Sequence, residues 1–434
     1  MFSSRRHLLF QPVSACRRLA VAWPKTGIAI GLAIVGLGIW GVYGSADDPF
    51  AAANRALKLD RLDQALEHAQ QCVDKWPGMT KAHLLVAHIQ RLRANFPEVE
   101  KHLKECKRLE GMTERIQLEW RLLRCQAGEL ASVERTLVHC VEQKHPQSAL
   151  ILECLSVALM KELRYRDALR CLDEWHKQEP DNVRALDWRG WVRARLELKE
   201  GAYEDCQKAL ELAPDHWRTR LRLAEMLLTD VRTPEAAQHF DILMVEHGDN
   251  SDVAVALAWC RSLQGRTDEA ERLLHVLLEK EPKNVTAIFY VSKLATTPVE
   301  KELWCRKVLA LESGHLDARY ALSTSLQQQG RTEEAAVELA KYKKMRGDVE
   351  RLHRILMPLL DKTPSNSELL VQIGEILLNI QESQGERFLQ RALETNPQHA
   401  RAHEILARFY ESKNELGKAK HHREMAEASH PKQR

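Results

Sequence analysis

The feature that most constrains the fold of this chain is a period of about 34 residues, marked by residues that end helices. Pro146, Pro180 and Pro214 are spaced by 34 residues, and Pro282 follows after 68, with Gly248 at the missing position. The series continues at four further positions, Pro77, Pro364, Pro397 and Pro431. In a chain of 434 residues, such a period predicts one long array of a repeated helical unit in place of unrelated domains.

Each repeated unit contains two amphipathic helical patterns joined by a short polar turn. One unit reads NVRALDWRGWVRARLEL over residues 182–198 and AYEDCQKALELAP over residues 202–214. Small residues recur where two helices approach closely: Ala53, Ala87, Gly190, Ala224, Ala258 and Ala407 in first helices, and Ala65, Ala168, Ala202, Ala236, Ala270, Ala335 and Ala419 in second helices. Because neither helix buries its apolar stripe alone, the units must stack into a continuous core.

These repeats resemble the tetratricopeptide repeat family, and the resemblance covers essentially everything from Ala46 onward. It implies an all-α, right-handed α-solenoid of about eleven helix-turn-helix units, which begin near residues 46, 80, 115, 149, 183, 217, 251, 285, 316, 367 and 400. We assign units 1–9 to residues 46–347, an extra helical insert to 348–366, and units 10 and 11 to 367–434. The third unit departs from the pattern, with Leu122 and Glu134 at its small positions, and the eighth is about three residues short.

An uncharged, apolar segment precedes the repeats. Residues 27–44 read GIAIGLAIVGLGIWGVYG, and a helix of this length spans roughly 27 Å, close to the thickness of a bilayer core. Five Lys or Arg residues precede the segment, and Asp47 and Asp48 follow it. By the positive-inside rule, this pattern predicts a transmembrane helix over 26–44, a basic cytoplasmic segment over 1–25 and a repeat body on the far, periplasmic or extracytoplasmic side. The chain is therefore expected to be a single-pass, bacterial-type membrane protein.

Three other interpretations of the N-terminus stay open. Gly44-Ser45-Ala46 is a small-residue site of the kind cleaved in signal peptides, and cleavage there leaves a soluble periplasmic or secreted adaptor. The Arg-rich, acid-free segment 1–25 also suits a mitochondrial presequence, and hence the mitochondrial inner membrane. Arg5-Arg6 is similar to a twin-arginine export signal.

Charge is distributed unevenly along the chain. The formal net charge is +3, but the five basic residues within 1–46 leave 59 basic against 61 acidic residues in the repeats, or about −2. A body this close to neutral has no general field that attracts phosphate backbones. We therefore expect no nucleic-acid partner.

Neither the cysteines nor the histidines form a recognisable catalytic or metal motif. The ten cysteines include no C-x-x-C pair, and Cys72, Cys106 and Cys140 repeat at intervals of 34 residues where other units have alanine. We expect these three to be free, buried fillers, because equivalent positions in adjacent units lie about 10 Å apart, too far for a disulfide. The 19 histidines include no H-E-x-x-H motif, and the chain has no phosphate loop or nucleophile elbow. The sequence thus predicts no metal, no cofactor and no catalysis.

The family resemblance implies that the first helix of each unit lines a concave face that binds peptides or partner helices. In our phasing the inward-facing residues are Arg184, Asp187, Trp191 and Arg195 of unit 5, Arg218 and Glu225 of unit 6, and Trp259 of unit 7. Tryptophan flanked by arginine is typical of residues that dominate protein interfaces. Alternatively, Trp191 and Trp259 lie half-buried between neighbouring helices.

These features together predict a non-catalytic, membrane-anchored scaffold or adaptor. It would bind a protein partner along its concave face through many small contacts, while the anchor confines the encounter to the membrane. An enzyme or cofactor carrier that uses the groove as a pocket is the remaining alternative, and it requires clustered titratable residues at matched positions.

Overall fold

The computed structural model describes residues 48–356, 359, 362–380 and 384–429. Within these ranges the protein has 22 α-helices, one short π-helical segment and no β-strand, so the prediction of an all-α fold is confirmed. The transmembrane helix predicted over 26–44 and the basic segment 1–25 lie outside the described residues. Among the helices that are described, none is long and apolar enough to cross a membrane.

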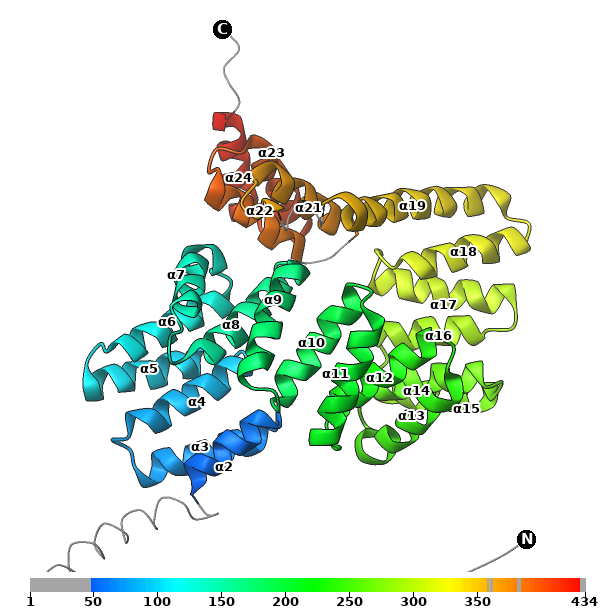
Figure 1. Ribbon diagram of the computed structural model, residues 1–434. Helices are drawn as coiled ribbons and strands as arrows, with labels where there is room; N and C mark the ends of the chain where they lie inside the picture. The colour runs from blue at the N-terminus through cyan, green and yellow to red at the C-terminus, as the bar shows by residue number, and fades with distance from the viewer. Residues whose placement is uncertain (1–47, 357–358, 360–361, 381–383, 430–434) are drawn as a thin grey trace, which may run out of the picture.

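The α-helices follow one another as eleven helix-turn-helix pairs, with each pair stacked against the next (Figure 1). The first helices begin within about three residues of the unit starts expected from the sequence. The pairs are α2 (Pro49–Lys58) with α3 (Leu62–Lys75), α4 (Thr80–Leu92) with α5 (Phe96–Glu110), α6 (Glu114–Ala127) with α7 (Leu130–Glu142), α8 (Ser148–Lys161) with α9 (Tyr165–Gln178), α10 (Val183–Arg195) with α11 (Lys199–Leu212), α12 (Trp217–Thr229) with α13 (Thr233–His247), α14 (Ser251–Leu263) with α15 (Thr267–Lys280), α16 (Val285–Leu294) with α17 (Pro298–Leu311), α18 (Leu316–Gln328) with α19 (Thr332–Arg351), α21 (Ser367–Asn379) with α22 (Gln384–Thr395), and α23 (Ala400–Ser412) with α24 (Leu416–Ser429).

The periodic prolines stand just ahead of the helix that starts each new pair. Before α10, Pro180 is followed two residues later by Asn182, whose side-chain oxygen accepts a hydrogen bond from the backbone N–H of Ala185. Asn250, Asn284 and Asn366 cap α14, α16 and α21 in the same way, two residues after Gly248, Pro282 and Pro364. The period in the sequence therefore marks a repeated turn and N-cap, which fix where each unit begins.

Most pairs reverse direction through one residue in the left-handed conformation. Glycine takes this place in three pairs, but six pairs use another residue with φ between 56° and 61°, namely Asp60, Ala94, Leu163, Glu197, Val231 and Asn414. This conformation costs energy for any residue other than glycine, so the packing around these turns must hold it in place. Two of these turns, at Asp60 and Leu163, also make contacts with distant parts of the chain.

Small residues let the two helices of a pair approach closely. At Gly190 of α10, an added Cβ would lie 3.3 Å from both the Cβ of Asp205 and the Sγ of Cys206 on α11. The alanines at the predicted small positions are completely buried in several pairs, as at Ala53, Ala65, Ala168, Ala202, Ala236 and Ala270. The apolar stripes therefore pack into cores that continue from one pair to the next.

The last two pairs return to an earlier part of the array. The long helix α19 ends at Arg351 and continues into a π-helical segment at Leu352–Leu356, so the extra helical insert predicted over 348–366 begins as an extension of α19. Beyond it, the four helices α21–α24, here called the C-terminal lobe, pack together around their own apolar core. Figure 1 shows this lobe beside α8 and α9, with α19 crossing to reach it.

Two turns fasten distant parts of the chain together. At the C-terminal closure, the turn between α8 and α9 places Glu162 between Arg387 and Arg391 of α22, and Leu163 packs against the core of the C-terminal lobe. At the N-terminal closure, the turn between α2 and α3 reaches α10 and α12 through three residues, Leu59, Asp60 and Arg61. The solenoid is therefore closed on itself at two places, and its concave face is divided into sectors.

Candidate functional site

The N-terminal closure fills one sector of the concave face with a network of buried charges. Arg184 donates from Nε to Asp60 Oδ1 at 2.6 Å, across 124 residues of sequence, and from Nη1 to Glu153 Oε1 at 2.8 Å. At either end, His88 Nε2 lies 2.6 Å from Glu153 Oε2, and His216 Nε2 lies 3.1 Å from Asp60 Oδ2. Basic and acidic side chains thus alternate from α4 to α12.

The network favours the charged form of the Glu153 and Asp60 carboxyl groups. Burial by itself raises the pKa of Glu153, but His88, Arg184 and Arg91 outweigh this and hold that pKa at about 2. The pKa of Asp60 is also lowered, because the attraction of Arg184 and His216 exceeds the effect of burial. Removal of one partner would leave a buried charge without compensation, so these groups form a structural joint.

Asp187 is held by its neighbours one turn further along α10. It accepts a hydrogen bond of 2.6 Å from Thr219 Oγ1 and forms an ion pair with Arg222. The exposed fractions of Arg184 and Asp187 are only 3% and 2%. The chain's own residues therefore cover most of these two predicted groove residues, which border a cavity of about 810 Å³ beside the turn at Asp60.

Four other predicted residues line a single open cavity, here called the α10–α12 hollow, which has a volume of about 440 Å³. They are Trp191 and Arg195 from α10, and Arg218 and Glu225 from α12. Trp217, Leu221, Arg222, Met226, Thr229 and Asp252 complete most of the wall. The structure therefore brings together Trp191, Arg195, Arg218 and Glu225 around one cavity.

Trp191 and Arg195 form the most distinctive part of this hollow. The Trp191 ring is half-buried and meets Tyr165 edge-on, with 5.7 Å between the ring centroids. The Arg195 guanidinium lies over the same ring at 5.1 Å and forms no ion pair with any described residue. An aromatic wall beside an exposed guanidinium can receive an apolar side chain together with a hydrogen-bond acceptor.

Glu225 contributes a carboxylate whose surroundings differ from those of the buried network. Its side chain is open to the hollow, yet the protein around it excludes enough bulk water to raise its pKa, against the opposing attraction of Arg222 and Arg195. The two arginines thus compensate this carboxylate only in part. Glu225 is a polar group that faces the cavity and can still gain a partner.

Trp259 lies apart from the α10–α12 hollow. Its ring packs against Tyr290 with 5.3 Å between centroids, and the Nζ of Lys293 lies 4.5 Å from the ring. The ring is half-buried, as one of the two sequence-based interpretations expected. Trp191 and Trp259 therefore occupy equivalent repeat positions but different environments.

Sequence reasoning missed the residue that covers Arg184, because the contact is a tertiary one. Asp60 belongs to the first pair, and no feature of the repeat relates it to a position 124 residues later. A left-handed aspartate was also not foreseen at that turn. By contrast, Trp217 and Arg222 could have been found from the sequence, because they lie on the same helix as the predicted Arg218 and Glu225.

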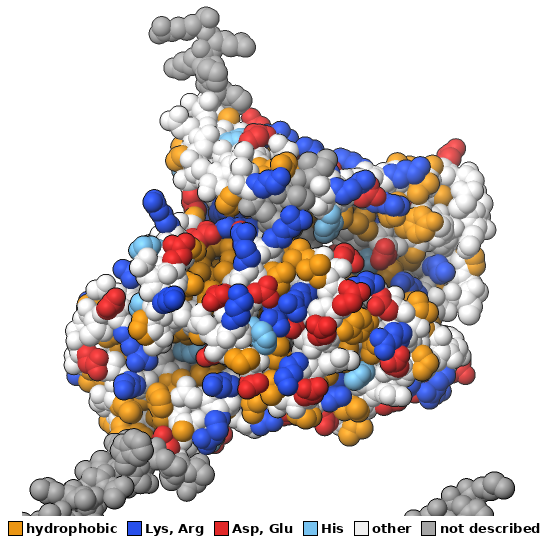
Figure 2. Space-filling view, viewed as in Figure 1, with side chains coloured by type: hydrophobic (Ala, Val, Ile, Leu, Met, Phe, Trp, Pro, Cys, Tyr) orange, Lys and Arg blue, Asp and Glu red, His pale blue; other side chains and the backbone are white. Residues whose placement is uncertain are grey.

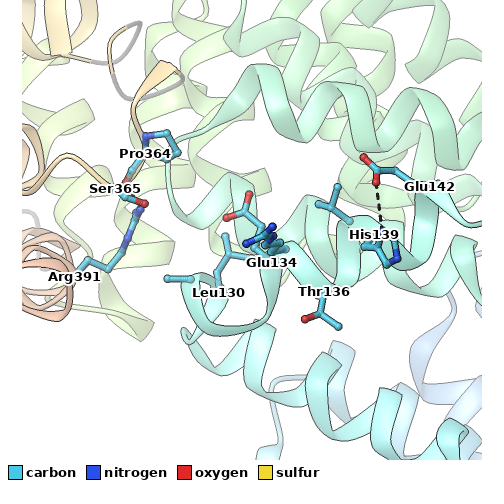
Figure 3. A pocket seen from close by; sticks show the side chains of 11 residues that line it. Leu130, Glu134, Thr136, His139, Glu142, Pro364, Ser365 and Arg391 are labelled. Atoms are coloured by element: carbon cyan, nitrogen blue, oxygen red, sulfur yellow. Dashed lines mark hydrogen bonds and ion pairs between the residues drawn. The ribbon is translucent and has the colours of Figure 1, made fainter.

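A second cavity, of about 880 Å³, lies beside the C-terminal closure (Figure 3). Its polar groups mostly interact with one another. Arg391 donates to the backbone oxygen of Pro364 at 2.6 Å, and His139 lies 3.8 Å from Glu142. On one side α7 contributes Leu130, Glu134, Thr136, His139 and Glu142, and on the other lie Pro364, Ser365 and Arg391. Acidic and basic groups balance here, so this cavity has no evident preference for a charged ligand.

The cysteines and the surface offer no further chemical centre in the part of the chain that the structure describes. No group of three His, Cys, Asp or Glu side chains is placed to hold a metal ion there. Cys72 and Cys106 are buried and free, but Cys140 is free and half-buried, so the predicted burial is wrong for Cys140. The reason is that α7 turns only Leu130, Val133 and Leu137 fully inward. Figure 2 shows acidic and basic side chains interspersed over one face.

Comparison with family models identifies the repeat class. Residues 155–216 and residues 227–290 each match a model described as a tetratricopeptide repeat. The first segment runs from within α8 to the start of α12, and the second runs from the last turn of α12 into α16, so most of α12 lies between the two matches. These two segments are therefore similar to tetratricopeptide repeats, and the eleven stacked helix pairs have the arrangement that such repeats form.

Solved structures with similar helical arrangements are distant in sequence. PilW, a type IV pilus biogenesis factor, is 19% identical over 48% of this chain and 94% of its own, with a TM-score of 0.40. The human IFIT1 dimer with PPP-AAAA is 15% identical over 88% of this chain and 94% of its own, with a TM-score of 0.41. A tetratricopeptide repeat protein from Parabacteroides merdae is 14% identical over 75% of this chain and 97% of its own, with a TM-score of 0.32. No curated protein sequence matches the chain.

Proposed function

We propose that this protein is a non-catalytic scaffold or adaptor that binds a segment of a partner protein on its concave face, in and around the α10–α12 hollow. The observation that carries this proposal is the half-buried Trp191 ring and, stacked on it, the Arg195 guanidinium, which has no ion-pair partner among the described residues. Side chains of these two types anchor protein interfaces, because they combine a large apolar area with directional hydrogen bonds. Further small contacts along the solenoid would add to this anchor.

An enzymatic role has less support from the same cavity. Catalysis by acid and base needs titratable groups within hydrogen-bond reach of one another and of a substrate. In the α10–α12 hollow, the acidic side chains Glu225 and Asp252 face arginines and a tryptophan, and no nucleophile stands beside a base. The arrangement suits recognition better than chemistry.

Site-specific crosslinking tests the proposed surface. A photoreactive amino acid in place of Arg195 in the full chain should capture a protein partner in intact cells, whereas the same group at Arg272, exposed on α15, should not. A matched Trp191→Ala variant should reduce capture from position 195. Equal capture from both positions, or capture that does not depend on Trp191, would place the binding surface elsewhere.

We further propose that residues 26–44 anchor the protein in a membrane, with the repeat body on the side opposite to residues 1–25. Support comes from the uncharged run over residues 27–44 and from the five basic residues before it. Protease added to the outer face of intact membranes should digest the repeat body. Complete protection there would reverse the topology, and a mature N-terminus after Ala46 would instead favour the cleaved, soluble adaptor.

A further inference from the structure

A larger cavity, here called the inter-lobe groove, opens between the middle of the array and the C-terminal half. It has a volume of about 1290 Å³ and is bounded by α8, α9, α10 and α12 on one side and by α19, the π-helical segment and α21 on the other. It shares Trp191, Arg195 and Arg222 with the α10–α12 hollow, so the two cavities are continuous. The volume exceeds the usual range of about 300–1,000 Å³ for small-molecule pockets and suits a peptide segment.

The floor of the inter-lobe groove is apolar and aromatic. Trp188, Trp191 and Tyr165 line it from the middle of the array, and Met160 lies beside them. Leu352 and Leu377 line it from the side of the C-terminal half. Because apolar surface faces the cavity from both sides, an occupant gains most by presenting apolar side chains in two directions.

The rim of the groove is one-sided in charge. Four cationic side chains, Lys161, Arg166, Arg195 and Arg222, line it together with His353, and Glu197 is the single acidic lining residue. The neighbouring cavities differ, since acidic and basic groups are balanced in the one beside α7 and nearly so in the α10–α12 hollow. This excess of positive charge also contrasts with the repeats as a whole, which carry about −2.

Arg222 is paired with Asp187, but part of the remaining positive charge has no carboxylate partner among the described residues. Among the described residues, Arg195 forms no ion pair, and Lys161 donates one hydrogen bond, to the backbone oxygen of Gln126 at 3.3 Å. Burial and the nearby Arg387 lower the pKa of Lys161, as expected for an ammonium group that has cationic neighbours and no carboxylate partner. A carboxylate placed at this rim would relieve the repulsion between the cations.

We propose that the inter-lobe groove binds an acidic, amphipathic segment of a partner protein, with its apolar side chains on the aromatic floor and its carboxylates at Arg195 and Lys161. This proposal rests on the proposed function and names the chemistry of the partner. The chain's own N-terminal segment is a poor occupant, because residues 1–46 contain five basic and no acidic residues. Charge complementarity therefore favours another protein.

Peptides of matched pattern test the required charge. Three labelled 15-residue peptides with the same Leu and Phe positions carry Glu, Gln or Lys at all other positions, and are titrated by fluorescence anisotropy into the detergent-solubilised full chain. Affinity should fall in the order Glu, Gln, Lys, and the Glu peptide should bind more weakly as salt rises. Equal binding of the Glu and Gln peptides, no binding by any of them, or tighter binding of a peptide of residues 1–25 would overturn the proposal.

Variants of the protein test the place of binding. Arg195→Glu and Lys161→Glu should each lower the affinity for the Glu peptide by about tenfold or more, because each places a negative charge opposite the peptide's carboxylates. The matched charge reversal Arg272→Glu, on the exposed face of α15, should change affinity less than about twofold, as exposed charges remote from a site do. The proposal would be contradicted if Arg195→Glu left the affinity for the Glu peptide unchanged. It would also be contradicted if the unaltered protein formed a dimer that Arg195→Glu abolished. Photocrosslinking at position 195 distinguishes this inference from the proposed function. If position 195 captures a partner protein but the groove shows no preference for acidic peptides, the proposed function stands and only this inference fails.

Discussion

Two neighbouring sectors on α10 differ in whether the rest of the chain covers them. Arg184 and Asp187, near the start of the helix, are covered and paired by residues that the chain itself supplies. Trp191 and Arg195, about two turns further on, face an open cavity, and Arg195 has no carboxylate partner among the described residues. The same helix thus serves as a structural joint at one end and as a candidate recognition surface at the other.

The difference shows that the direction in which a repeat residue points does not decide its role. The sequence predicts that all four side chains face the groove, but a turn from the first pair brings Asp60 to Arg184, and no described carboxylate forms an ion pair with Arg195. The C-terminal closure repeats the principle, since Glu162 of one turn supplies the counter-charge for Arg387 and Arg391. Where the chain closes on itself, opposite charges pair within the protein, whereas Arg195, between the closures, has no ion-pair partner among the described residues.

The largest effect is expected from Arg184→Met. This change leaves Asp60 and Glu153 buried without their shared cation, and the loss of one member of a buried pair costs about 3–5 kcal/mol. Chemical denaturation followed by circular dichroism measures it. The matched Arg195→Met variant should stay within about 0.5 kcal/mol of the unaltered protein. Equal destabilisation by both variants would remove the distinction between the two sectors.

The next effect concerns the acid stability of the network. The pKa of Glu153 is about 2 in the folded protein and near 4.5 when the chain is unfolded, so the unfolded state binds more protons between these values. The stabilisation is fully present above pH 4.5 and is lost as the pH falls toward 2, by about 3 kcal/mol in total. Denaturation curves at several pH values should show this slope, and Glu153→Gln should flatten it. An unchanged slope would mean that Glu153 is not held in its charged form.

A smaller effect is expected at the C-terminal closure. Glu162→Gln removes the negative charge between Arg387 and Arg391 and should cost about 1–3 kcal/mol, because the cations then face each other and a buried amide. The loss should be local, so amide hydrogens of α21–α24 should exchange faster than those of α12–α17. Glu427→Gln, an exposed position on α24, is the control and should leave exchange unaltered. Protection of α21–α24 equal to that of the original chain would show that the ion pairs do not hold the lobe.

A further pH effect is expected from the last helix pair, which lies outside both sectors. In the last pair, the Nδ1 atoms of His403 and His422 lie 2.9 Å apart, and burial together with His403 and His421 lowers the pKa of His422 to about 4. Since free histidine titrates near 6.5, its contribution to stability is complete above that pH and is lost as the pH falls toward 4. His422→Gln should remove this slope and keep the one below pH 4.5. If the slope between pH 6.5 and pH 4 persists in His422→Gln, His422 is not its source.

Much of the fold was predictable because it depends on local signals. The proline period coincides with turns and N-caps such as Asn182, and the small residues mark close helix contacts such as that at Gly190. The closures were not predictable, because Asp60 and Glu162 meet partners 124 and 225 residues away. For the same reason the sequence grouped Arg184 with Arg195: periodicity gives the face of a helix, and only the tertiary fold decides what covers that face.

The smallest expected effect on folding belongs to Trp191, and it tests the open sector directly. Trp191 is half-buried, whereas Trp175 on the neighbouring α9 is 2% exposed and lies in the same apolar cluster. Trp175→Ala should therefore cost about 3–5 kcal/mol, as truncation of a buried aromatic side chain does. Trp191→Ala should cost only about 1 kcal/mol of stability, in line with its smaller buried area, but about 2 kcal/mol or more of partner affinity. Thermal unfolding and binding titrations of both variants measure the two quantities separately. If Trp191→Ala destabilises the protein as much as Trp175→Ala and leaves affinity unaltered, its ring belongs to the core, and the open sector has lost its anchor.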